Sequence, residues 1–88
     1  MASYRLLIKL SAAKELEAVG SRKDRRRLVA KIRSLAANPR PPGCQKLSGS
    51  EKYRARQGAF RIVYSIEDDR LVVMIVRVAH GREVYRSS

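Results

Sequence analysis

The chain has 88 residues, with 20 Lys or Arg against 8 Asp or Glu, so its formal net charge is +12 at pH 7. This length allows a single domain, residues 1–88, with one modest core. No apolar run approaches the ~20 residues that span a bilayer, and no signal-peptide pattern opens the chain, so we expect a cytoplasmic protein. The charge favours nucleic acid as the first partner class, an acidic protein as the second and a membrane surface as the third.

Residues 3–10 predict a strand, because apolar side chains alternate there with others. Ser11 stands where the N-cap of a helix belongs, and Gly20 follows where such a helix ends. The apolar residues between them have helical spacing: Ala12, Leu16 and Val19. The chain therefore begins with a strand and a short helix.

Ser21 and Asp24 form a weak capping-box pattern that opens a second helix. Asn38 and Pro39 stop it, because the residue before a proline disfavours helical geometry. One apolar stripe runs along this helix: Leu28, Ile32 and Leu35, flanked by Val29 and Ala36. Since each helix of the resulting hairpin has a single stripe to bury, a sheet is the natural cover.

Residues 39–50 are rich in Pro, Gly and Ser and predict a loop. After it, two alternating segments flank Gly58, as in a β-hairpin. On the second segment, one face carries Phe60, Ile62, Tyr64 and Ile66, and the other carries Arg61, Val63 and Ser65. On the first segment, Arg54 and Arg56 point away from Tyr53 and Ala55.

Residues 67–69 form an acidic turn, and residues 71–78 are almost entirely apolar, which predicts an interior strand. Alternation assigns Val72, Met74, Val76, Val78 and His80 to the face packed by the helices, and Leu71, Val73, Ile75 and Arg77 to the other. A strand, a helical hairpin and a three-stranded antiparallel meander give an α+β fold with both helices on one face of the sheet.

If the turn at Gly58 brings the two segments into register, Arg54, Arg56 and Arg61 converge on the face opposite the helices. A solvated face of a basic protein is one interpretation of this cluster. A phosphate pocket is the other, and it is favoured because the stretch from residue 52 to residue 66 contains no acidic residue.

RNA is the phosphodiester that such a site suits, because its 2′-hydroxyl is a built-in nucleophile. Guanidinium groups hold a phosphate in place and stabilise charge in the transition state. Metal-dependent hydrolysis is not expected, since the acidic turn lies beside Arg70, and no cofactor is expected either. Cys44 is the only cysteine, so we expect neither an intramolecular disulfide nor a zinc cluster.

His80 and Tyr85 are the two candidates for proton transfer. Each has a plainer alternative: His80 as a structural or surface residue, and Tyr85 as a core residue or as a ring that stacks on a base. The basic start of the second helix is either a solvated turn or an auxiliary contact to RNA backbone. The expected substrate contacts are Arg22, Lys23, Arg26, Lys52, Arg77, His80 and Arg86.

Several motifs together resemble the RelE toxins of the RelE/ParE superfamily. They are the segments 46–49, 53–56 and 60–64, the strand end at Arg77 and Val78, and the segment 82–85. The resemblance covers essentially the whole chain. It implies a toxin of a type II toxin-antitoxin system that cleaves mRNA in the ribosomal A site. It also implies a cognate antitoxin with an acidic, partly helical segment, and contact with DNA only through that antitoxin.

The resemblance also implies roles for individual residues. Arg54 and Arg56 match the basic residues that take part in proton transfer and phosphate binding, and Arg61 matches the arginine that stabilises the transition state. Tyr85 matches the tyrosine that stacks on the substrate nucleotide. The arginine that serves as general acid aligns with Gly81 or Arg82, and we assign Arg82. Two alternatives remain: a ParE-like inhibitor of DNA gyrase and a noncatalytic RNA-binding protein.

Overall fold

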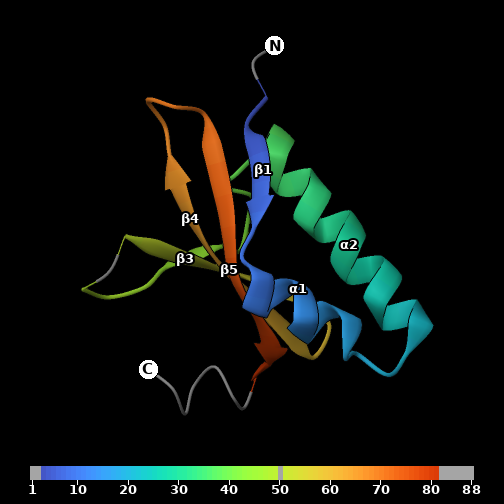
Figure 1. Ribbon diagram of the computed structural model, residues 1–88. Helices are drawn as coiled ribbons and strands as arrows, with labels where there is room; N and C mark the ends of the chain where they lie inside the picture. Colours follow the sequence, from blue (N-terminus) through green and yellow to red (C-terminus); the bar gives the residue numbers. More distant parts are fainter. Residues whose placement is uncertain (1–2, 50, 82–88) are drawn as a thin grey trace.

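A computed structural model describes residues 3–49 and 51–81 of the chain. Its elements follow the order β1 (Arg5–Ile8), α1 (Leu10–Glu17), α2 (Arg22–Ala37), β2 (Gln45–Lys46), β3 (Lys52–Gln57), β4 (Phe60–Glu67) and β5 (Val72–His80). The strands form one sheet in the order β1-β5-β4-β3-β2, and both helices lie on the same side of it (Figure 1). The expected α+β architecture is confirmed, because residues from both helices share one core with the sheet.

Strands β3, β4 and β5 form the expected antiparallel meander, and β1 pairs in parallel with the first half of β5. The second half of β5 continues after β1 has ended, and Glu15 on α1 covers its edge. One Glu15 carboxylate oxygen accepts the Val78 backbone N–H at 3.0 Å, and the other lies 3.5 Å from Arg77 Nε. A helix side chain thus satisfies a strand edge that would otherwise stay unpaired.

The first helix differs at both ends from the sequence prediction. Lys9, not Ser11, occupies the N-cap position, and no side chain caps the helix. The Lys9 backbone N–H donates to the Ile75 carbonyl at 2.9 Å, so the last pairing of β1 with β5 determines where the helix starts. The helix ends at Glu17, before Gly20, the expected stop.

The second helix follows its local signals. Ser21 Oγ accepts the Asp24 backbone N–H at 3.2 Å, which confirms the predicted cap. The predicted apolar stripe is the buried one: Leu28, Ile32 and Leu35. Neither helix in the described part of the chain is long and apolar enough to cross a membrane.

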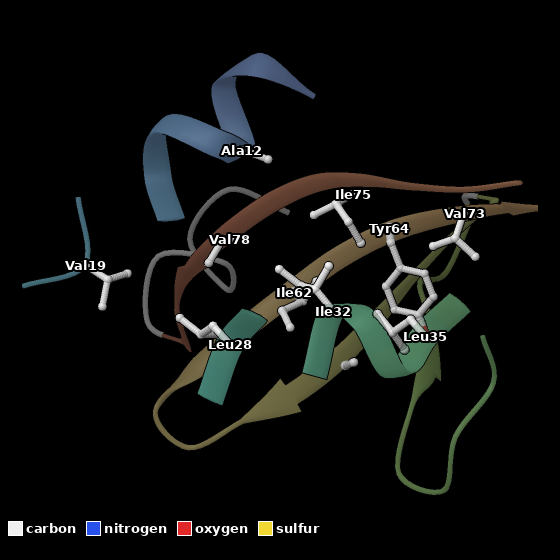
Figure 2. Packing of buried hydrophobic residues seen from close by; sticks show 11 residues of the cluster. Ala12, Val19, Leu28, Ile32, Leu35, Ile62, Tyr64, Val73, Ile75 and Val78 are labelled. Atoms are coloured by element: carbon white, nitrogen blue, oxygen red, sulfur yellow. The ribbon is translucent and has the colours of Figure 1, made fainter. Parts of the chain in front are cut away.

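The core lies between the helices and the sheet. Its buried residues include Ala12, Leu28, Ile32, Leu35, Ile62, Tyr64, Val73, Ile75 and Val78 (Figure 2). Tyr64 is the largest fully buried side chain, and its hydroxyl donates to the Pro39 carbonyl at 2.7 Å. This bond ties the end of α2 to the centre of the sheet, and burial raises the pKa of the Tyr64 phenol.

The predicted side-chain rows of β5 are wrong for most of the strand because of a β-bulge. Tyr64 pairs with Ile75 and Val63 pairs with Arg77, so Val76 is an extra residue between the two pairs. The first half of β5 therefore buries Val73 and Ile75 against the helices, rather than Val72 and Met74. After the bulge the alternation is reversed, which places Val78 and His80 on the helix side, as predicted.

The expected loop 39–50 contains strand β2, which pairs with Tyr53 and Arg54 of β3. Two residues are too few for alternation to be recognised, and the surrounding Pro and Gly residues indicated only a loop. The pairing extends the sheet by one strand and, as described below, supplies a partner for Arg54.

Candidate functional site

The three arginines predicted to converge do lie on one face of the β3–β4 hairpin. Arg56 is paired with Arg61, and Arg54 is paired with Val63, so their side chains share the face opposite the helices. The hairpin turns through Gly58 and Ala59, and Gly58 has a φ of 59°. A tight two-residue turn requires such a value at one of its central positions, where glycine adopts it without strain.

A small cavity separates these side chains. It has a volume of about 110 Å³ and is lined by Gly43, Gln45, Arg54, Arg56 and Arg61. This volume equals that of several water molecules, so it admits an anion of the size of a phosphate group. On the same face of the sheet Val63 and Ala79 are buried, and the partly buried Leu47 packs against them.

Neutral oxygens orient two of the guanidinium groups. Arg54 Nη2 donates to the side-chain oxygen of Gln45 at 2.6 Å. Arg61 Nη1 donates to the Phe60 carbonyl at 3.0 Å and to the Gly58 carbonyl at 3.4 Å. The acceptors in these contacts carry no formal charge, so they hold the groups in place. Within residues 3–49 and 51–81, no carboxylate lies at salt-bridge distance from Arg56 or Arg61.

Gly81 packs directly against the Arg61 guanidinium. Its backbone N–H donates to the Ala59 carbonyl at 2.9 Å, and a Cβ atom added to it would lie 3.4 Å from the central guanidinium carbon of Arg61. Gly81 thus forms part of the wall around Arg61 and has no side chain for proton transfer. Arg82, Tyr85 and Arg86 lie outside the described residues.

The other predicted contacts are not gathered at this cavity. Arg77 lies on the same face of the sheet as the three arginines, but its Nε points to Glu15. Lys52 lies at the start of β3, at the other end of the strand from Arg56. His80 lies on the helix side, with its ring 5.6 Å from that of Phe60. The basic residues at the start of α2 belong to the helix layer, across the sheet from the arginines: Arg22, Lys23 and Arg26.

The acidic turn lies at the far end of the hairpin, where it holds a different arginine. Arg40 donates two hydrogen bonds to the Asp68 carboxylate, at 3.0 and 2.9 Å, and the Tyr4 hydroxyl donates a third at 2.7 Å. These bonds, above all those from Arg40, lower the pKa of Asp68 to about 2. Among the described residues, no three His, Cys, Asp or Glu side chains gather as metal ligands would.

A family model described as "ParE toxin of type II toxin-antitoxin system, parDE" matches residues 6–85. The chain belongs to this toxin family. Toxin RelG of Mycobacterium tuberculosis (strain ATCC 25618 / H37Rv) is 38% identical over 42 residues, which are 48% of this chain. The matched segment is 46% of that relative, so the alignment spans about half the length of the curated toxin.

Solved structures confirm that the toxin is of the RelE type. The archaeal RelE–RelB complex from Pyrococcus horikoshii OT3 matches with a TM-score of 0.80 and 29% identity, over 91% of this chain and 98% of the other. The isolated E. coli RelE toxin matches with a TM-score of 0.77 and 29% identity, over 97% and 94% of the two chains. The predicted membership of the RelE/ParE superfamily is therefore confirmed.

Two residues of the toxin's site were not predicted from its sequence. Gln45 holds Arg54, and Gly43 lines the same cavity. The signal for both was the position of the segment 43–45 directly before the motif that begins at Lys46. That signal is weak, because nothing in the local pattern indicates that the segment pairs with β3.

Proposed function

We propose that this toxin is a ribosome-dependent endoribonuclease that cleaves mRNA and so inhibits translation. The observation that supports this function best is the cavity between Arg54, Arg56 and Arg61 on the face of the sheet that the helices leave open. Three guanidinium groups around a phosphate-sized space match a phosphodiester whose negative charge increases during the reaction. The likeness to RelE-type toxins supports the same assignment.

The reaction uses the nucleophile of the RNA itself. The 2′-oxygen attacks the adjacent phosphorus while the 5′-oxygen of the next nucleotide leaves, which yields a 2′,3′-cyclic phosphate and a 5′-hydroxyl. Arg54 and Arg56 bind the phosphate and keep the attack in line, and Arg61 stabilises the charge of the five-coordinate transition state. Arg82 as general acid and Tyr85 as stacking platform complete the proposed set.

His80 has no direct part in this proposal, because it lies across the sheet from the arginine cavity and packs against Phe60. His80→Gln should therefore change single-turnover cleavage on programmed ribosomes only slightly between pH 5.5 and 8.5. A loss of about a hundredfold, the usual scale for a missing general acid or base, would make His80 the proton donor or acceptor.

An antitoxin is the second proposed partner, and it binds through an acidic, partly helical segment laid over the helical hairpin and the sheet edge. Exposed apolar residues along β1 and the start of α1 support this surface: Leu7, Ile8 and Leu10. The basic start of α2 adds charge complementarity. An operon neighbour that neither co-purifies with the toxin nor rescues growth would contradict this proposal.

Purified toxin added to ribosomes programmed with a defined mRNA tests the function. We expect cleavage within the A-site codon, with a 5′-hydroxyl on the downstream fragment, and no cleavage when the attacking 2′-hydroxyl is replaced by hydrogen. The match to ParE toxins makes gyrase poisoning the alternative, which would instead give double-strand DNA breaks with purified gyrase. A noncatalytic RNA-binding protein would give neither product.

A further inference from the structure

We infer that the cleft at the outer edge of β3 binds the nucleotide next to the phosphate held by the three arginines. This inference rests on the proposed RNA substrate. The cleft has a volume of about 670 Å³. Its walls are Lys31 of α2, the loop at residues 41–44 and the last turn of the hairpin at residues 55–58.

The cleft exists because β2 is shorter than the strand it accompanies. Gln45 is paired with Arg54, and β3 then runs on to Gln57 with no outer neighbour among the described residues. The Leu47 N–H donates to the Lys52 carbonyl at 2.9 Å, so the backbone groups of Lys52 point outward. Because these directions alternate along a strand, the N–H and C=O of Arg56 point outward too, into the cleft.

The cleft and the arginine cavity are neighbours. Gly43 and Arg56 line both of them, so a polymer bound at one reaches the other across the edge of β3. A single-stranded RNA whose scissile phosphate lies among the arginines would enter the cleft with its adjacent nucleotide. The larger volume of the cleft fits a base and sugar, where the smaller cavity fits only a phosphate group.

The chemistry of the lining matches a nucleotide. Lys31 and Arg56 are cations of the lining, and none of its described residues is acidic. A base presents hydrogen-bond donors and acceptors along its edge, and the outward N–H and C=O of Arg56 form a complementary pair. An added peptide strand is the other class of ligand for an open strand edge. A peptide strand fits less well, because it needs several outward-facing backbone positions to pair with. Between Arg54, which pairs with β2, and the turn at Gly58, only Arg56 offers one.

Binding of a fluorescent single-stranded RNA hexamer, measured by anisotropy across a salt series, tests the cleft without the ribosome. Lys31→Ala should weaken binding several-fold and lower the slope of log affinity against log salt by about 0.7, the value of one lost phosphate contact. Arg33→Ala is the matched control. It removes one charge from the exposed surface of the same helix, outside the cleft, and should leave the slope unchanged.

Cleavage on ribosomes then locates the contact. Two mRNAs are compared, each with a neutral methylphosphonate linkage in place of one phosphate, one nucleotide before or one nucleotide after the scissile bond. If Lys31 contacts one of these phosphates, Lys31→Ala and the unaltered toxin should cleave the corresponding mRNA at the same rate. Equal salt slopes for Lys31→Ala, Arg33→Ala and the unaltered toxin would overturn the inference and leave the proposed function intact. Failure of the unaltered toxin to cleave, with the Lys31 effect on RNA binding preserved, would overturn the catalytic proposal alone.

Discussion

The two ends of the β3–β4 hairpin each hold arginine side chains, but with different partners. At the open end of the hairpin, Arg40 meets the Asp68 carboxylate and the hydroxyl and ring of Tyr53, whose centroid lies 5.2 Å from the guanidinium carbon. At the turn end, Arg54 and Arg61 donate to an amide oxygen and to backbone carbonyls. The open end therefore neutralises Arg40, whereas at the turn end neutral oxygens orient Arg61, and no carboxylate among the described residues lies at salt-bridge distance from it.

This difference separates an arginine that serves the fold from the arginines to which we assign substrate binding. Arg40 connects the loop after α2 to Asp68 in the β4–β5 turn, and Asp68 also accepts the Tyr4 hydroxyl, so the cluster joins three segments that are distant in sequence. The hydrogen bonds of Arg61 stay within its own hairpin, so their loss should cost the fold little. The partners of an arginine therefore indicate its role better than its exposure does.

Arg61→Ala is the sharpest test of this comparison and has the largest expected effect. Loss of one donor to the transition state should lower ribosome-dependent cleavage by about 100- to 1,000-fold, and growth arrest on expression should disappear. Thermal unfolding should stay close to that of the unaltered toxin. Arg40→Ala is the matched control, because it removes a guanidinium group from the open end of the hairpin. It should retain cleavage and lower the Tm. A folded Arg61→Ala toxin that still arrests growth at full strength would refute the assignment.

Gln45→Ala tests whether the neutral oxygen matters to the arginine that it holds. Without the hydrogen bond from Arg54, cleavage should fall about tenfold, the equivalent of one charge-assisted hydrogen bond of ~1.4 kcal/mol. Gln45→Glu keeps an acceptor but adds negative charge to the cavity, so it should lower cleavage further. Lys46→Ala, on the next residue of β2, is the control. If Gln45→Ala cleaves as fast as Lys46→Ala, Gln45 has no positioning role.

Asp68→Asn tests the neutralised end through pH. The pKa of Asp68 is lowered from 3.8 to about 2 in the folded chain, so its ionised form stabilises the fold. That stabilisation is fully present above the unfolded value and is lost as pH falls from about 4 to about 2. The Tm difference between the unaltered toxin and Asp68→Asn should therefore be constant above about pH 5 and shrink in acid. A difference that stays constant down to pH 2 would contradict the role of the carboxylate.

Leu71→Gly has the smallest expected effect and should raise stability. Leu71 has a φ of 54° in the β4–β5 turn, a left-handed conformation that costs a branched side chain about 1 kcal/mol. Glycine adopts it freely but loses more entropy on folding, so the net gain should be about 0.5 kcal/mol in chemical denaturation. Cleavage should not change, because the turn lies at the far end of the hairpin from the arginine cavity.

Local signals in the sequence determined much of this protein. The period of two on either side of Gly58 was enough to place Arg54, Arg56 and Arg61 on one face, because a two-residue turn fixes the register of a hairpin. The stripe of α2 and the Ser21 cap were equally local, since helical periodicity and capping depend on residues at most four apart. The family resemblance was also contained in these contiguous segments.

Only the tertiary structure decided how distant segments meet. The bulge at Val76 reversed the rows of β5, and no residue there marks it in the sequence, because it follows from pairing with β4. Strand β2 and the bond from Gln45 to Arg54 depend on a loop folding back onto β3, and the bond between Arg40 and Asp68 joins residues 28 apart. Side-chain alternation predicts which face a residue occupies within one strand. Long-range packing decides which atoms contact a given arginine and whether they carry a compensating charge. Local periodicity does not encode that packing.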